Sequence, residues 1–212
     1  MKNLRPQIFF TQEPLSAMNT KKIYTNLYQV DSVLKPKTID QCLHADLTLV
    51  RHQFLPVDRT YTRKVLIPDQ PWLQSALQEV SVTVGGFVRS LRPEFTHMLA
   101  VVWHDIPGFG TDRHQDVPGD RGVLQLYIHS GAPTIGTRFY LPSGDAYTFE
   151  YRPNTGYLHF DPGLEHEFAG DGVGAGDTRI SIYAYFIPAH GTESLIREYN
   201  EVYPGAVYHT RN

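Results

Sequence analysis

The chain contains 212 residues with a net charge of −3 at pH 7, and 41% of its residues are hydrophobic. This length fits one globular domain with a sizeable core, and the slight acidity argues against nucleic acid as a partner. No apolar run reaches the roughly 18 residues of a membrane helix, and the N-terminal stretch has no apolar run typical of a secretion signal. The single cysteine, Cys42, fits a reducing compartment, so we expect a cytoplasmic protein without a membrane partner.

Two helices are predicted in the first part of the chain. Residues 37–43 and 71–80 place apolar side chains on one helical face, and a proline opens the second stretch, where it suits a first turn. The second helix can extend to Leu91, and the pair Gly85-Gly86 is expected to interrupt it. Between the helices, residues 59–67 predict a strand or an ordered loop, and an edge strand is favoured there over a lid.

From His97 onward, short apolar runs alternate with turn residues. This spacing predicts seven strands without an intervening helix, which is typical of a sandwich or a barrel. The runs cover residues 98–103, 122–128, 137–141, 147–151, 157–160, 165–169 and 178–187. We therefore predict a mainly β fold, a double-stranded β-helix (jelly roll), with the N-terminal helices packed on one sheet.

The predicted parts form one structural domain. Residues 1–95 are expected to be an extension of helices and strand that supports the barrel. Residues 96–188 are expected to be the jelly-roll core that carries the functional site. Residues 189–212 are polar and rich in tyrosine, and we expect a short helix and tail there.

The tripeptide H-x-D occurs three times, beginning at His44, His114 and His159. Residues i and i+2 of a strand point to the same face, so such a pair can offer an imidazole and a carboxylate to one metal ion. A chain with ten histidines contains about one such tripeptide by chance, so the surroundings have to decide. His44 lies in a predicted helical stretch, where residues i and i+2 diverge by about 200°, which is poor geometry for chelation.

The surroundings favour His114-Gln115-Asp116 as the metal site. It follows the turn-rich stretch 106–111 and precedes a further Pro-Gly turn and a strand, which places it at the rim of the barrel. The copy at His159 would leave His114 and Arg179 without a role. With the distant His166, the favoured pair supplies two imidazoles and one carboxylate, a set that suits non-heme Fe(II) and leaves positions open. Arg179 can hold the far carboxylate of a dicarboxylic cosubstrate in a bidentate manner.

The order of these elements resembles the Fe(II)- and 2-oxoglutarate-dependent oxygenases, and in particular their prolyl-hydroxylase-like branch. That family has an apolar strand ending in an aromatic residue and a Pro-Gly turn, then H-x-D, a strand with a tyrosine, a His-Glu pair, and an arginine opening the last strand. The corresponding segments of this chain are residues 101–108, 114–116, 124–129, 164–168 and 178–183. The resemblance extends over about residues 97–188.

Carried over residue by residue, the resemblance implies three iron ligands: His114, Asp116 and His166. It implies Arg179 as the partner of the distal carboxylate of 2-oxoglutarate, and Tyr127 as a hydroxyl donor to the same carboxylate. Ser181 is two residues beyond Arg179 on the same strand face and is expected to add another hydroxyl. The expected cofactor is therefore Fe(II), with 2-oxoglutarate and O2 as cosubstrates.

The resemblance implies hydroxylation of an unactivated C–H bond of a small molecule, an amino acid or other carboxylate being favoured, or of a peptidyl side chain. Asp116 favours hydroxylation over halogenation, because related halogenases have a small residue at that position. Tyr185 stands where the nucleic-acid demethylases of this superfamily carry a second arginine, which disfavours a nucleic-acid substrate. The alternatives are a non-catalytic metal-binding jelly-roll or cupin module and a cupin isomerase, whose site would need a further histidine such as His129 or His159.

Substrate contacts in this fold are expected from the N-terminal extension and from loops at the barrel mouth. The candidates are Trp103, Arg113, Arg121, Arg138 and Tyr140. If Arg113 or Arg138 faces the iron, an anionic substrate is favoured. For each of the five, packing or a surface ion pair is the competing interpretation.

Overall fold

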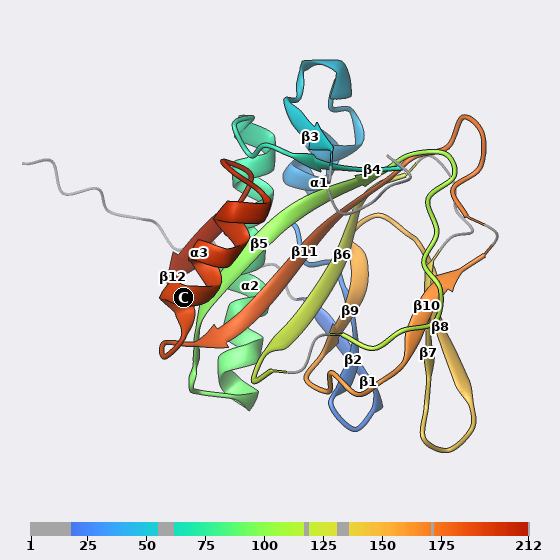
Figure 1. The fold of residues 1–212 in the computed structure, drawn as a ribbon, viewed down its shortest axis with the longest axis vertical. Coiled ribbons are helices and arrows are strands. Elements are labelled where there is room, and N and C mark those ends of the chain that lie inside the picture. Colours follow the sequence, from blue (N-terminus) through green and yellow to red (C-terminus); the bar gives the residue numbers. More distant parts are fainter. Residues whose placement is uncertain (1–17, 55–61, 117–118, 131–135, 171, 212) are drawn as a thin grey trace, which may run out of the picture.

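The structure is a computed structural model that describes residues 18–54, 62–116, 119–130, 136–170 and 172–211. Figure 1 shows two antiparallel sheets, with helices beside the larger one. The strands are β1 (Asn19–Tyr24), β2 (Leu27–Asp31), β3 (His52–Phe54), β4 (Arg63–Leu66), β5 (Phe95–Asp105), β6 (Gly122–Ser130), β7 (Gly136–Tyr140), β8 (Ala146–Phe149), β9 (Thr155–His159), β10 (His166–Ala169), β11 (Arg179–Pro188) and β12 (Tyr208–Arg211).

The two sheets have the topology of a jelly roll, as the sequence predicts. Among the described residues, the large sheet has nine strands in the order β1-β2-β9-β6-β11-β5-β4-β3, with β12 paired to β5. The small sheet has the order β10-β7-β8. All seven strands expected from His97 onward are present, because their apolar runs are long enough to be buried between turns.

The helices are α1 (Pro36–Leu43), α2 (Pro71–Leu91) and α3 (Thr192–Val202), with a short 3-10 turn at Leu47–Leu49. The prediction that Gly85-Gly86 interrupts the second helix is wrong, since α2 runs through the pair as a single helix of 21 residues. Val84, Gly85 and Val88 are all buried. This packing outweighs the roughly 1 kcal/mol that each helical glycine costs relative to alanine.

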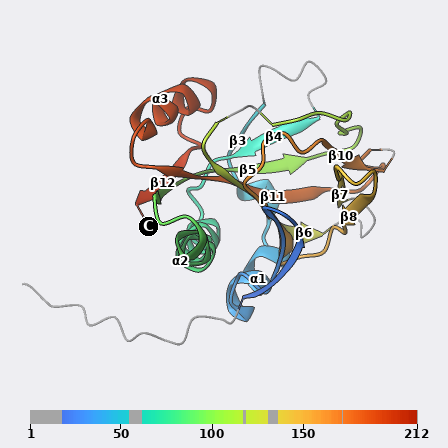
Figure 2. The same ribbon diagram turned by 90° about the horizontal axis from the view of Figure 1, so that it is seen from below.

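Helices α1 and α2 cover one face of the large sheet, and the small sheet lies away from them (Figure 2). The main core forms between these helices and the sheet, with Leu73, Leu77 and Val80 of α2 packed in one cluster with residues of β5, β6 and β11. Strand β11 lies between β5 and β6, and all ten of its residues are buried. The centre of the large sheet is therefore a rigid base for side chains that point toward the small sheet.

Strands from both flanks of the predicted core join the large sheet. The hairpin β1–β2 pairs through β2 with β9, and β12 in the expected tail pairs with β5. The sequence did not predict β1, because this edge strand leaves most of its side chains exposed and so has no alternation of apolar residues. The strand expected within residues 59–67 is β4 at the positions that the structure describes, and residues 59–61 lie outside them. None of the described helices combines the length and apolarity needed to cross a membrane.

Candidate metal centre

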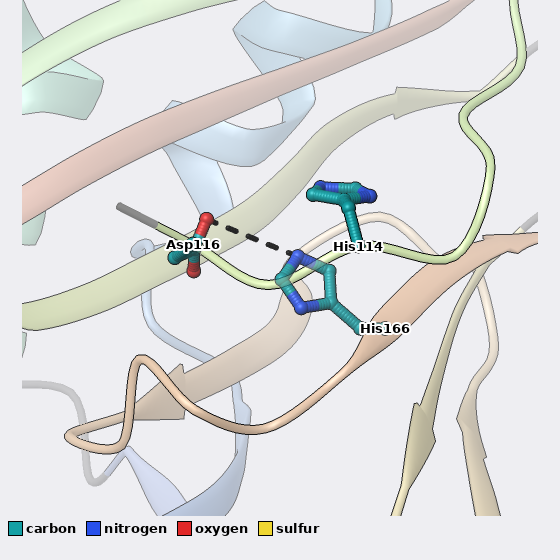
Figure 3. Close-up of side chains that lie close together, drawn as sticks. All are labelled: His114, Asp116 and His166. Atoms are coloured by element: carbon teal, nitrogen blue, oxygen red, sulfur yellow. Dashed lines mark ion pairs between the residues drawn. The ribbon is translucent and has the colours of Figure 1, made fainter. Parts of the chain in front are cut away.

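His114 and His166 are brought together by their own backbones. The N–H of His114 donates to the carbonyl of His166 at 2.9 Å, and the N–H of His166 donates back at 2.8 Å. This isolated bridge sets the two rings with centroids 4.5 Å apart. Asp116 follows two residues after His114, and one ligand atom of each of the three residues lies within 4.8 Å of the others (Figure 3). The group can hold a metal ion.

Both imidazoles are arranged with the same ring nitrogen free. Nδ1 of His114 is 2.6 Å from the carbonyl oxygen of Asp112, and Nδ1 of His166 is 3.2 Å from that of Leu164. Because a carbonyl only accepts, each Nδ1 carries the proton and each Nε2 keeps its lone pair for a metal. Burial lowers the pKa of His166, against the opposing effect of Asp116, and keeps this ring neutral.

Asp116 is held by three neighbouring side chains. Its Oδ1 accepts from the Tyr183 hydroxyl at 3.2 Å and lies 3.9 Å from Nε2 of His166. Its Oδ2 lies 3.0 Å from Nε2 of His159. Burial alone would raise the pKa of this carboxyl, but the contacts to His159, His166 and Tyr183 outweigh burial and hold the pKa below its usual range. Asp116 is therefore an ionised carboxylate at neutral pH.

The three residues line a cavity of about 90 Å³ to which strands of both sheets contribute. Its other charged or polar lining includes side chains from strands of both sheets and from the segment before the first metal-site histidine. The lining residues outside the metal group are Arg63, Trp103, Thr111, Gln125, Thr137, Tyr157, Glu167, Phe168, Arg179 and Tyr183.

Arg179 opens β11 and is buried at this cavity. Its Nε and Nη2 donate to Oδ2 of Asp105 at 2.8 and 2.7 Å, while its Nη1 is buried and has no hydrogen-bond partner among the described residues. The guanidinium also lies over the ring of Phe168, 4.5 Å from its centroid. A buried donor without a partner is costly, so this nitrogen is the natural place for an anionic ligand.

Asp105 holds a second arginine beside the first. Nε of Arg63 donates to Oδ1 of Asp105 at 2.6 Å, and Nη2 donates to Oδ2 at 3.2 Å. The Arg63 guanidinium lies 3.9 Å from the ring centroids of both Trp103 and Phe109. Burial would raise the pKa of Asp105, but the charges of Arg63 and Arg179 hold it below its usual range. Two guanidinium groups thus share one carboxylate and leave an excess positive charge at the cavity.

The two predicted hydroxyl donors are both fully buried, one layer behind the cavity lining. The hydroxyl of Tyr127 lies 2.9 Å from Oγ1 of Thr137, and Oγ of Ser181 accepts from Nε2 of Gln125 at 3.1 Å. Thr137 and Gln125 line the cavity in their place, and Oε1 of Gln125 accepts from the hydroxyl of Tyr157 at 2.8 Å. Tyr127 and Ser181 are therefore hydrogen-bonded to the cavity lining, but Thr137 and Gln125 are the residues that face the cavity.

Of the five substrate candidates, Trp103 lines the cavity, where its ring stacks on Tyr183 with centroids 4.0 Å apart. Arg113 is exposed, pairs with Glu165 and lies over the ring of Tyr140. The other arginines are also engaged away from the metal group. Arg138 pairs with Glu167 at 3.3 Å, Tyr140 donates to Glu167 at 2.6 Å, and Arg121 lies 4.9 Å from the ring centroid of Tyr185.

Reasoning from the sequence considered His159 only as a competing metal ligand, and it gave no role to four other residues at the site: Arg63, Asp105, Gln125 and Tyr183. Two of them carry a signal that alternation could have found. Gln125 is two residues before Tyr127 on β6, and Tyr183 is two residues beyond Ser181 on β11, so each shares a strand face with a predicted site residue. The positions of Arg63, Asp105 and His159 depend on which strands become neighbours.

Comparison with known proteins identifies the fold. No family model and no curated protein matches the sequence. A prolyl-4-hydroxylase from Pseudomonas putida is similar with a TM-score of 0.57 and 18% identity, covering 77% of this chain and 92% of that one. A prolyl hydroxylase from Trichoplax adhaerens, in complex with a peptide of a hypoxia-inducible factor, has a TM-score of 0.59 and 15% identity over 77% and 84%.

A third similar structure is SnoN, a non-heme α-ketoglutarate-dependent epimerase of nogalamycin biosynthesis. It has a TM-score of 0.55 and 14% identity, covering 77% of this chain and 78% of its own. At these identities the likeness shows the fold alone: this chain shares the jelly-roll fold with the three proteins.

Proposed function

We propose that the protein is an Fe(II)- and 2-oxoglutarate-dependent oxygenase that hydroxylates an unactivated C–H bond of a small molecule. The observation that carries this proposal is the cavity itself. A His-Asp-His group lines it, and so does Arg179, whose buried Nη1 has no hydrogen-bond partner in the part of the chain that the structure describes. A dicarboxylic cosubstrate that binds the metal at one end requires a cation for its other carboxylate.

The donor set of the metal group fits iron. His114 and His166 each offer Nε2, because Nδ1 faces a carbonyl oxygen, and Asp116 offers an ionised carboxylate, which together form a two-histidine, one-carboxylate set. When bound, Fe(II) and 2-oxoglutarate together activate O2 for oxidation of a C–H bond, and the cosubstrate leaves as succinate and CO2. The cupin-isomerase alternative loses support because neither His129 nor His159 belongs to the metal group found among the described residues.

The residues that line the cavity would bind the cosubstrate and limit the access of water to it. Arg179 would bind the distal carboxylate with Nη1, while Asp105 fixes the opposite edge of its guanidinium. Thr137 and Gln125 would face the cosubstrate, with Tyr127 and Ser181 behind them as their hydrogen-bond partners. The ring of Phe168 over the guanidinium limits access of water to this ion pair.

We propose a carboxylate-bearing substrate, such as an amino acid, because of the position of Arg63. Arg113 and Arg138 form ion pairs with Glu165 and Glu167, while Arg63 lines the cavity beside Trp103. Asp105 occupies Nε and Nη2 of Arg63, so a substrate carboxylate would meet its remaining nitrogen. A panel of acids and their amides tests this: acids should stimulate 2-oxoglutarate consumption more, and Arg63→Gln should remove the difference. Equal stimulation by acids and amides contradicts the carboxylate preference.

The experiment that tests the function measures succinate after incubation of the purified protein with Fe(II), 2-oxoglutarate and O2. We expect slow formation without a substrate and faster formation with a suitable one. Binding of Mn(II) and 2-oxoglutarate is measured in parallel by calorimetry. A folded protein that binds neither contradicts the proposal, whereas binding of both without consumption across a broad substrate panel identifies a non-catalytic metal-binding module.

A further inference from the structure

His159 lies behind the metal group and is buried completely. It ends β9, which is paired on one side with β2 and on the other with β6, so its backbone is fixed from both sides. Its Nδ1 lies 3.0 Å from the carbonyl oxygen of Asp161, and its Nε2 lies 3.0 Å from Oδ2 of Asp116. The ring of Phe139 packs against it with an edge contact, at 5.4 Å between centroids. Nδ1 therefore faces a carbonyl oxygen, whereas Nε2 lies within ion-pair distance of the carboxylate without a hydrogen bond among the described residues.

His159 is placed outside the group of possible metal ligands. The residues whose ligand atoms all lie within 4.8 Å of one another are His114, Asp116 and His166, and His159 does not join them. His159 contacts Oδ2 of Asp116, whereas Oδ1 of Asp116 faces His166 at 3.9 Å. His159 and His166 thus approach different oxygens of the Asp116 carboxylate, with their ring centroids 6.0 Å apart.

The H-x-D tripeptide that contains His159 has a different use from the one at His114. The carboxylate of Asp161 accepts from the backbone N–H of Gly163 at 2.9 Å and so holds the turn after β9. The carbonyl of the same residue faces Nδ1 of His159. The same carbonyl also accepts from the N–H of Leu164 at 3.3 Å. Asp161 therefore orients the histidine and stabilises the turn.

We propose that His159 is a positioning residue for Asp116: it holds Oδ2, so that Oδ1 is the oxygen presented toward His114 and His166. The Tyr183 hydroxyl, which donates to Oδ1 at 3.2 Å, completes the hold on the carboxylate from β11. Groups that orient metal ligands in this way commonly contribute about 10- to 100-fold to metal affinity. This inference rests on the proposed metal site, and it assigns His159 to the support of that site.

The test compares His159→Phe, which keeps a ring without an N–H, with His159→Gln, which keeps one donor. The dissociation constants of Mn(II) and Co(II) are measured by titration, and the Co(II) absorption spectrum reports the coordination. We expect His159→Phe to bind both ions about 10- to 100-fold more weakly and His159→Gln to fall between it and the wild type. The Co(II) spectrum of the bound form should keep its shape. The matched control is His129→Phe, since His129 is half-buried on β6 and has no contact with Asp116 among the described residues.

The outcomes separate this inference from the proposed function. Unchanged affinity in both folded His159 variants overturns the positioning role while leaving the metal site intact. A Co(II) spectrum that indicates one nitrogen ligand fewer also overturns it, because His159 would then be a ligand. Absence of metal binding by the wild type overturns both proposals. Thermal unfolding of each variant checks the fold, and His159→Gln alone decides the question if His159→Phe does not fold.

Discussion

The two sheets contribute different parts of the candidate site. The small sheet provides His166 at the start of β10, and the backbone bridge from His166 fixes His114 beside it. The large sheet provides Arg179, Asp105 and Arg63, which form the positively charged end of the cavity. The large sheet is backed by α1 and α2, whereas the small sheet carries an outer ladder of polar side chains that includes Arg138 and Glu167, of which Glu167 also lines the cavity.

This difference predicts that the proposed metal binding and the proposed cosubstrate binding are separable by mutation. Changes on the small-sheet side should act on the metal, and changes on the large-sheet side should act on the dicarboxylate. Asp116 is the connection between them, because it extends from the small-sheet side to His159 and Tyr183 of the large sheet. The predictions below test how cleanly the two sides separate.

The largest effect is expected for Asp116→Ala, which removes the charged ligand of the metal group. We expect Mn(II) affinity to fall by more than about 100-fold and succinate formation to be lost, because the two remaining imidazoles form an incomplete site. His44→Ala is the matched control, since His44 belongs to an exposed H-x-D tripeptide. Tight metal binding by folded Asp116→Ala would remove the metal group from the proposed mechanism.

Arg179→Lys tests the large-sheet side. Lysine keeps the positive charge but lacks the planar guanidinium, which can bond Asp105 on one edge and still offer Nη1 to a ligand. We expect the KM for 2-oxoglutarate to rise about 10- to 100-fold, as for loss of one charge-assisted hydrogen bond, with the Mn(II) dissociation constant unchanged. Equal losses in metal and cosubstrate binding would show that the two sheets do not act separately.

His104 makes the stability of the large sheet depend on pH. It lies on the sheet face opposite to Asp105, and burial lowers its pKa to about 4, aided by the charge of Lys64 and opposed by Asp105, with smaller effects of His129 and His52. The unfolded chain has the ordinary histidine pKa near 6.5, so the unfolded state binds more protons between these values. The stability from neutral His104 is therefore fully present above about pH 6.5 and declines as the pH falls toward 4.

The measurement is the free energy of unfolding in urea at pH 7 and at pH 4.5. The wild type should lose on the order of 1–2 kcal/mol more than His104→Gln over this interval, after allowance for the partial exposure of the ring. The slope that remains in the variant includes the contributions of the other histidines with lowered pKa values: His129, His166 and His209. An identical slope in both proteins would exclude His104 as the source.

The smallest effect is expected for Arg138→Ala on the outer ladder of the small sheet. Its ion pair with Glu167 is partly exposed, and such pairs contribute about 0–1 kcal/mol. The KM for 2-oxoglutarate and the Mn(II) affinity should stay within about twofold of the wild type. A larger change in metal affinity would mean that the outer ladder also orients His166, the residue before Glu167 on β10.

The sequence predicted the strands of the barrel and the metal group because both depend on local patterns. Apolar runs between turns predict β5 to β11. The spacing of His114 and Asp116 predicts that these two side chains lie on one side of the chain. The order of the later elements then selected His166 and Arg179. The resemblance to an oxygenase family added the expected roles, and the fold is confirmed by the similar solved structures.

The residues that support the site were not predictable in this way. Asp105 meets Arg179 only because β5 pairs with β11 in the register that places the two residues opposite each other. Arg63 joins them because β4 pairs with β5 with Arg63 opposite the same aspartate. His159 looked like a competing metal ligand, and its position behind Asp116 follows from the pairing of β9 with β6. Strand pairing over long sequence separations decides such contacts, and no local pattern encodes it.

The central position of β11 has a consequence for synthesis of the protein. β5 and β6 both pair with this strand, yet both precede it in the chain. A ribosome that adds about 5–20 residues per second therefore exposes two long, apolar strands with unpaired edges for seconds before β11 emerges. Such edges are templates for aggregation. A chaperone that covers strand edges during synthesis should thus raise the yield of folded protein.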